Sequence, residues 1–171
     1  MLVSPLEDQH MNEDDYCRIF ADALASDPAF RQWVLTRTKF FDRREATLLV
    51  EEQSVRPAKH WWRHWWTQLP DGSQSETDVF AVFHDQEDGA RFALHLECKV
   101  AKGKFMPNQP AQYALRGEHM MSNKWAPYAQ FDTILLAPAA FAQAYPTDTH
   151  AFGAFISFED VGRWLPAFRS I

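Results

Sequence analysis

Cysteine and long apolar runs are scarce in this chain of 171 residues. The only cysteines, Cys17 and Cys98, are too few for a disulfide framework or a cysteine-based zinc site, and we expect both to be core thiols. No apolar run approaches the roughly 18 residues that a membrane-spanning helix requires. The stretch from Met1 to Asp15 is acidic, which is the wrong charge for a secretory signal. These absences predict a cytoplasmic protein with no membrane partner.

Several common catalytic motifs are missing as well. The sequence has no P-loop, no glycine-rich dinucleotide turn, no HExxH motif and no GxSxG motif. Its 17 Lys and Arg residues against 23 Asp and Glu residues give a net charge of −6, which argues weakly against a nucleic-acid partner. Acidic and basic blocks nevertheless alternate along the chain. This alternation suits carboxylates beside a basic rim, although an ordinary charged surface gives the same pattern.

What the sequence does contain is enough apolar material for one core. The chain is 46% hydrophobic and 15% aromatic, and its length predicts a single domain over residues 1–171. The apolar spacing predicts helices and strands that alternate in the manner of an α/β fold with a mixed central sheet. The predicted helices span 13–36 (broken at Ser26-Asp27-Pro28), 107–124, 139–145 and 158–165, and the predicted strands span 46–55, 77–84, 91–99, 131–137 and 151–157.

Four tryptophans lie within residues 58–67. The positions of Trp61, Trp62, Trp65 and Trp66 predict a helix with all four side chains on one face, with a strand as the alternative. A tryptophan-rich core or interface helix is the favoured interpretation. The other interpretation is a platform on which nucleic-acid bases stack, because an aromatic face accepts any base.

The predicted strand 91–99 carries the most informative polar residues. Its period of two places Phe92, Leu94, Leu96 and Cys98 on one face and His95, Glu97 and Lys99 on the other. If this strand forms a hairpin with strand 77–84, Asp78 lies across from Glu97 and Lys99. Two such carboxylates repel each other, and Mg²⁺ would convert the repulsion into binding. A plain salt bridge on a sheet surface is the alternative, and His95 either contacts this site or is a satisfied interior residue.

Polar residues also follow this strand. Gln109, Tyr113 and Arg116 share one face of the predicted helix 107–124, where they either form an exposed polar stripe or hold phosphate oxygens and metal ligands. Lys102 and Lys104 lie in the preceding loop, where they either contact backbone phosphates or remain solvated.

These residues together resemble the PD-(D/E)xK nuclease superfamily. The resemblance rests on Asp78, on the Glu97-Cys98-Lys99 triplet and on the Gln-x-x-x-Tyr spacing of Gln109 and Tyr113, and Thr77 stands where the motif has proline. The predicted α-β-β-β-α-β order over residues 13–137 is similar to the core of that superfamily. The resemblance implies a three-layer α/β/α restriction-endonuclease-like core with a mixed central β-sheet.

The resemblance also implies roles for individual residues. Asp78 and Glu97 would ligate Mg²⁺, for which Mn²⁺ can substitute, and the Cys98 backbone carbonyl and Glu13 would add ligands; Asp14 and Asp15 are the alternatives to Glu13. Lys99 would position the attacking water and stabilise phosphate charge. The implied catalytic set is Asp78, Glu97, Lys99, Gln109 and Tyr113, and the implied nucleic-acid contacts are Lys102, Lys104 and Arg116.

Three functions follow from these observations. The first is a Mg²⁺-dependent nuclease that hydrolyses phosphodiester bonds in DNA. The second is a catalytically silent nuclease-like fold that binds nucleic acid or protein. The third is an unrelated α/β domain whose tryptophan-rich helix binds a protein partner. The sequence leaves homodimerisation open.

Overall fold

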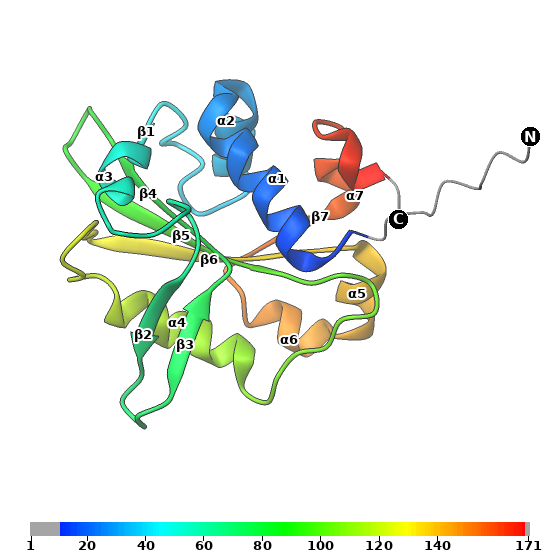
Figure 1. The fold of residues 1–171 in the computed structure, drawn as a ribbon. Helices are drawn as coiled ribbons and strands as arrows, with labels where there is room; N and C mark the ends of the chain where they lie inside the picture. The colour runs from blue at the N-terminus through cyan, green and yellow to red at the C-terminus, as the bar shows by residue number, and fades with distance from the viewer. Residues whose placement is uncertain (1–10, 170–171) are drawn as a thin grey trace, which may run out of the picture.

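A five-stranded mixed sheet forms the centre of the computed structural model, which describes residues 11–169 (Figure 1). Its strand order is β1-β4-β5-β6-β7; β4 is antiparallel to β1 and β5, whereas β5, β6 and β7 run parallel. A separate two-stranded sheet joins β2 to β3. The strands are β1 (Thr47–Leu48), β2 (Trp65–Gln68), β3 (Gln74–Thr77), β4 (Val79–His84), β5 (Arg91–Cys98), β6 (Gln130–Ala137) and β7 (Ala154–Ser157).

Helices cover both faces of the five-stranded sheet. In Figure 1, α1, α2 and α7 lie on one side of the sheet, and α4, α5 and α6 lie on the other. This arrangement confirms the predicted α/β class with a mixed central sheet. The helices are α1 (Glu13–Ser26), α2 (Pro28–Thr36), α3 (Val50–Ser54), α4 (Gln109–His119), α5 (Ala139–Ala144), α6 (Pro146–His150), α7 (Phe158–Val161) and the 3₁₀ helix η1 (Pro166–Arg169).

The first two helices both begin at side-chain caps. Asn12 and Asp15 form a capping box at the start of α1, in which each side chain accepts the backbone N–H of the other residue. Asp27 then caps α2 by accepting the N–H groups of Ala29 and Phe30, with Pro28 in the first turn. The predicted break between the two helices is therefore confirmed.

The central hairpin also agrees with its sequence. Gly89, with φ 72°, closes the turn between β4 and β5, and His84 pairs with Arg91. One face of β5 packs into the core that includes α1 and α2, as predicted. The opposite face is buried too, because α4 and the segment before β6 cover it. The residues of β5 that face α1 are Phe92, Leu94, Leu96 and Cys98.

The prediction of a strand over 46–55 was wrong for most of its length. Only Thr47 and Leu48 pair with β4, and the chain then turns into α3. The side chain of Gln53 replaces the missing strand, because it accepts the Val82 N–H at 2.7 Å and donates to the Phe80 carbonyl at 3.0 Å. A side-chain amide thus satisfies the buried edge of β4, which local strand propensity does not reveal.

The predicted helix over 58–67 was also wrong. Residues 61–64 form an irregular turn in which His64 has φ 61°, and β2 then pairs with β3 from Trp65 onward. Trp62 and Trp65 are buried in different apolar clusters, whereas Trp66 is 57% exposed. Hydrogen bonds from β3 outweigh the helical spacing, and tryptophan is a good strand former. The strand that the sequence left as the alternative is confirmed from Trp65 onward, so these tryptophans do not form an interface helix.

Several predicted boundaries shift. The helix predicted over 107–124 is α4, which ends at His119, and residues 120–126 form a turn held by Asn123. The strand predicted from residue 151 begins at Ala154, after α6, which was not predicted. The closing helix ends at Val161 and is followed by η1. These ends are set by turns that local periodicity does not mark.

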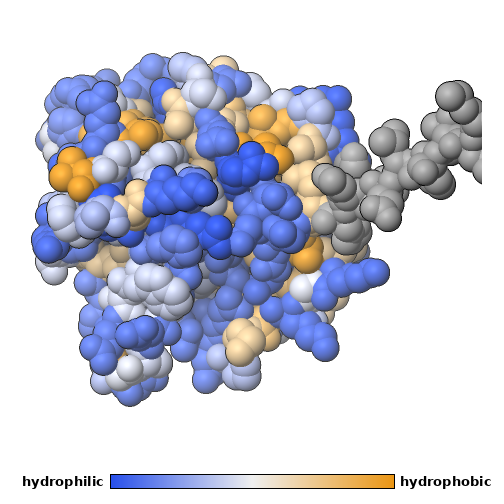
Figure 2. All heavy atoms as spheres, in the orientation of Figure 1, coloured by the Kyte–Doolittle hydropathy of each residue, from blue (hydrophilic) through white to orange (hydrophobic). Residues whose placement is uncertain are grey.

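The visible surface is mostly hydrophilic, and its hydrophobic residues form separate patches (Figure 2). Within residues 11–169, no helix is both long and apolar enough to cross a bilayer. The first part of the acidic stretch 1–15, and the ends of the domain predicted over 1–171, lie outside the described residues.

Candidate functional site

The antiparallel register of β4 and β5 brings the predicted acids together. Val79 pairs with Leu96, so Asp78 and Glu97 occupy the next positions at the end of the hairpin. The Asp78 Oδ2 accepts the Cys98 N–H at 2.9 Å, which fixes the aspartate beside the carboxyl end of β5. Asp78 remains partly exposed to solvent.

Glu97 and Lys99 form an ion pair at this end of β5. The Lys99 Nζ lies 2.9 Å from the Glu97 Oε1. Lys99 is only 6% exposed and Glu97 only 2%. Phe105, from the loop before α4, lies over the ammonium at 5.7 Å from ring centroid to Nζ. The salt bridge is therefore buried rather than solvated on a sheet surface.

The first turns of α4 supply the other partners of Glu97. Gln109 donates through Nε2 to the Glu97 Oε1, and its own Oε1 accepts the Met106 N–H at 2.9 Å. Tyr113, one turn later and fully buried, donates its hydroxyl to the Glu97 Oε2. The i, i+4 spacing thus points both side chains at one carboxylate, as the sequence predicts.

Helix α1 brings a third carboxylate to the same edge. Cys17 on α1 contacts Cys98 on β5, and both are buried free thiols, as predicted. One turn earlier, the Glu13 Oε1 lies 3.5 Å from the Val100 N atom. Of the three acids considered in this turn, Glu13 is the one at the site, because Asp14 pairs with Arg63 at 2.6 Å and Asp15 caps the helix.

These charges perturb one another. Burial raises the pKa of Asp78 well above its usual range, and the nearby carboxylates of Glu97 and Glu13 raise it further. Burial likewise raises the pKa of Glu13, although the Lys99 ammonium lowers it in part. Burial alone would lower the pKa of Lys99, but the surrounding carboxylates outweigh it and raise that pKa. Three carboxylates thus face a single ammonium.

The oxygen donors at this site are of the kind that a hard divalent cation prefers, but they do not surround a complete coordination site. Carboxylate oxygens are the donors that Mg²⁺ prefers, and Asp78 and Glu13 are both only partly buried. Both oxygens of Glu97 already accept hydrogen bonds from neighbouring side chains. Within residues 11–169, no group of three or more His, Cys, Asp or Glu residues is arranged as a metal site. Ligation through the Cys98 carbonyl stays a prediction.

The predicted nucleic-acid contacts fall into two groups. Lys102 and Lys104 are exposed in the loop between β5 and α4, and Lys102 lines a hollow of about 500 Å³ that also reaches Glu13. Arg116 is instead 2% exposed and donates through Nε to the Ser75 Oγ at 2.9 Å and through a terminal nitrogen to the Thr77 Oγ1 at 3.3 Å. Its guanidinium ties α4 to β3 and does not face a nucleic-acid strand.

His95 is a satisfied interior residue. Its Nδ1 and Nε2 lie 2.8 Å from the hydroxyls of Thr77 and Tyr128. Since Tyr128 donates to the Gly117 carbonyl, Nε2 must carry the proton and Nδ1 must accept from Thr77. Burial, with a smaller effect of Arg116, lowers the pKa of His95 to about 3, so the ring stays neutral.

Two features of the site were not predicted. The sequence gave no reason to place Phe105 over Lys99, since loop residues carry no periodic signal. The link from Ser75 and Thr77 to Arg116 was missed because β3 was not expected as a separate strand. Alternation of Ser75 and Thr77 before the predicted strand 77–84 is the signal that could have revealed it.

Comparisons of this chain with family models, with curated proteins and with solved structures found no match.

Proposed function

We propose that this chain is a Mg²⁺-dependent nuclease that hydrolyses phosphodiester bonds in DNA. The observation that carries the proposal is the convergence of Asp78 with Glu97 and Lys99, about twenty residues later in the chain, at the carboxyl end of β5. Gln109 and Tyr113 support the glutamate from α4, as the resemblance to PD-(D/E)xK nucleases implies.

The element order supports a restriction-endonuclease-like core. If α2, α3 and the β2–β3 hairpin are taken as additions, the elements α1, β1, β4, β5, α4 and β6 follow the α-β-β-β-α-β order. The helices on both sheet faces suit a three-layer α/β/α arrangement (Figure 1). This fold assignment, like the activity, is our proposal.

Each residue would have a distinct task. Asp78, Glu13 and Glu97 would hold Mg²⁺ or Mn²⁺, which lowers the pKa of bound water and neutralises charge on the phosphate. Lys99 would place a positive charge beside the scissile phosphate and orient the attacking water. Gln109 and Tyr113 would keep the Glu97 carboxylate in one orientation, and Lys102 and Lys104 would attract the substrate backbone.

Cleavage of plasmid and linear DNA tests this activity. We expect Mg²⁺-dependent products with the wild-type chain, and none with Asp78→Asn or Lys99→Met. Matched controls are Asp22→Asn on the exposed side of α1 and Lys59→Met, because neither residue lies at the site. Cleavage retained in both site variants would refute the assignment.

One observation favours a second candidate function, namely a silent fold that binds nucleic acid without cutting it. Glu97 and Lys99 are nearly inaccessible to solvent, and the carboxylate of Glu97 already contacts the side chains of Gln109, Tyr113 and Lys99. DNA binding in the presence of Mg²⁺, Mn²⁺ or Ca²⁺ with no cleavage in any of them would select this function over the first.

A further inference from the structure

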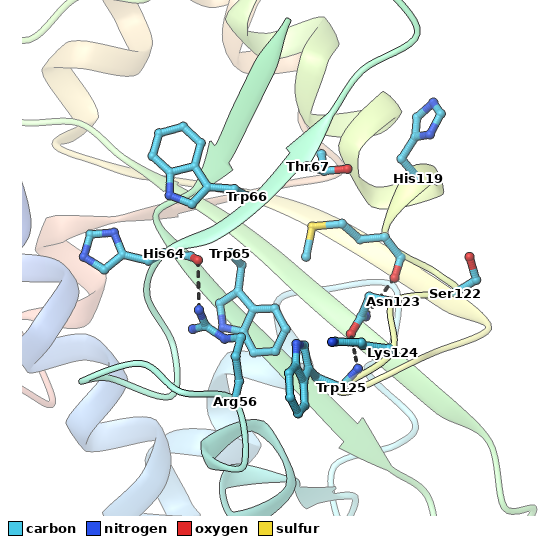
Figure 3. Close-up of a pocket in the computed structure, with 11 residues that line it drawn as sticks. Arg56, His64, Trp65, Trp66, Thr67, His119, Ser122, Asn123, Lys124 and Trp125 are labelled. Atoms are coloured by element: carbon cyan, nitrogen blue, oxygen red, sulfur yellow. Dashed lines mark hydrogen bonds between the residues drawn. The ribbon is translucent and has the colours of Figure 1, made fainter. Parts of the chain in front are cut away.

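A second polar hollow lies on the β2–β3 side of the molecule, away from α1. Its volume is about 410 Å³, and its walls come from β2 and from the turn after α4 (Figure 3). Trp66 of β2 and Trp125 of the turn both line it, although 59 residues separate them in the sequence. The Trp66 ring is exposed on the opposite side of β2 from Trp65 and Trp125, so the two tryptophans lie on either side of this strand (Figure 3).

The charges in this hollow have one sign. Its lining includes the cations Arg56 and Lys124 and contains no acidic residue, in a chain whose net charge is −6. Among residues 11–169, neither Arg56 nor Lys124 forms an ion pair. Glu76 lies outside the lining, where it accepts the backbone N–H of His64 and contacts the ring of the same residue. The hollow therefore favours an anion.

Each cation lies against an aromatic ring. The Arg56 guanidinium lies 4.1 Å from the centroid of the Trp65 ring and donates to the carbonyl of His64 (Figure 3). It also donates to the carbonyl of Arg63. The Lys124 ammonium lies 4.5 Å from the Trp125 ring centroid. These hydrogen-bond partners of Arg56 are neutral carbonyls, so they do not offset the charge of its guanidinium.

The turn that carries Trp125 is already ordered. Asn123 accepts the N–H groups of Trp125 and Ala126 and donates to the carbonyls of Met120 and Ala126. A ligand that binds against this turn therefore does not have to order it, and little binding free energy is lost to chain ordering.

The hollow adjoins the candidate catalytic edge through the β2–β3 pairing. Trp65 pairs with Thr77, which directly precedes Asp78. Pairing distance and one peptide step put the Cα atoms of Trp65 and Asp78 within about 9 Å of each other. A polymer held in the hollow can thus extend to the carboxylates.

We propose that this hollow and the exposed Trp66 beside it bind unpaired nucleotides of a single DNA strand, with one base stacked on Trp125, another on Trp66 across β2, and phosphates near Lys124 and Arg56. Exposed aromatic faces beside cations bind single strands in this way. The inference rests on the proposed function, because it names the strand form that the nuclease holds next to Asp78. It also assigns to Trp66, which lies on a strand, the base-stacking role that the sequence offered as the second interpretation of the four tryptophans.

Binding of fluorescein-labelled dT15, followed by anisotropy in EDTA so that no cleavage occurs, tests the proposal. We expect Trp66→Ala and Trp125→Ala each to weaken binding by about 5- to 100-fold, whereas Trp66→Phe retains most of the affinity. The matched control is Trp164→Ala, since Trp164 is 38% exposed and packs on Phe30 and Trp33 in the α2 layer. Lys124→Ala should reduce the dependence of log K on log salt by about 0.7.

Two results would overturn the inference. One is the absence of dT15 binding by the wild-type chain; the other is unchanged affinity in both Trp66→Ala and Trp125→Ala, with far-UV circular dichroism showing that both fold. The inference and the nuclease proposal fail separately. If the chain cleaves DNA but its dT15 affinity does not depend on the tryptophans, only the binding inference is refuted. If the affinity depends on the tryptophans but no divalent metal supports cleavage, the binding inference is supported and the nuclease proposal is refuted.

Discussion

The buried pair of Glu97 and Lys99 gives the sharpest prediction on stability. Its N···O distance is 2.9 Å, so at an effective dielectric of about 20 the attraction is about 6 kcal/mol. Desolvation of two charges costs several kcal/mol each, and the intact pair therefore contributes little net stability. Lys99→Met removes the attraction but leaves the carboxylate buried. We expect this variant to lose about 3–5 kcal/mol in its free energy of unfolding.

Urea denaturation at neutral pH measures this loss. A second variant, Glu97→Gln, removes the charge while keeping an acceptor for Tyr113 and a side chain of the same shape. The double variant Glu97→Gln/Lys99→Met should lose about 1–3 kcal/mol less in its free energy of unfolding than the two single losses add up to. The exposed control Lys59→Met should stay within about 0.5 kcal/mol of wild type. A loss below about 1 kcal/mol for Lys99→Met, or strict additivity, would refute the buried-pair reasoning.

Three further predictions concern the site and its support. The raised pKa of Asp78 means that ionisation of this carboxyl opposes folding. Asp78→Asn should therefore be more stable than wild type, by a margin that grows as pH rises above about 4. Mg²⁺ should reduce the difference in melting temperature between wild type and Asp78→Asn. No pH dependence would contradict this. Gly117→Ala places a methyl group too close to atoms of the Phe131 ring. It should lower the free energy of unfolding, measured by urea titration, by about 1–3 kcal/mol, and an unchanged urea midpoint would contradict this packing. Gln53→Leu strands the Val82 N–H and the Phe80 carbonyl and should cost about 2–4 kcal/mol, whereas the exposed Gln86→Leu should not.

The caps and the β4–β5 hairpin were predictable because their signals are local. Asn12 with Asp15, and Asp27 before Pro28, bond within their own turn, so neighbouring residues suffice to mark the helix ends. The alternation along β5 likewise separates Leu96 from Glu97 whatever the partner strand is. The meeting of Asp78 and Glu97 followed once a hairpin was assumed.

The remaining features depended on contacts between segments far apart in the chain. Gln53 ends a strand pattern because it bonds to Phe80 and Val82, 27 and 29 residues later, and β3 turns a helix-like run of tryptophans into β2. The sequence by itself determined the helix caps, the faces of β5 and the candidate acids. Only the tertiary structure decided that Glu13 joins those acids, that Arg116 is buried and that Trp66 and Trp125 both border one cationic hollow. Burial and long-range hydrogen bonds depend on which segments meet, which a local pattern does not encode.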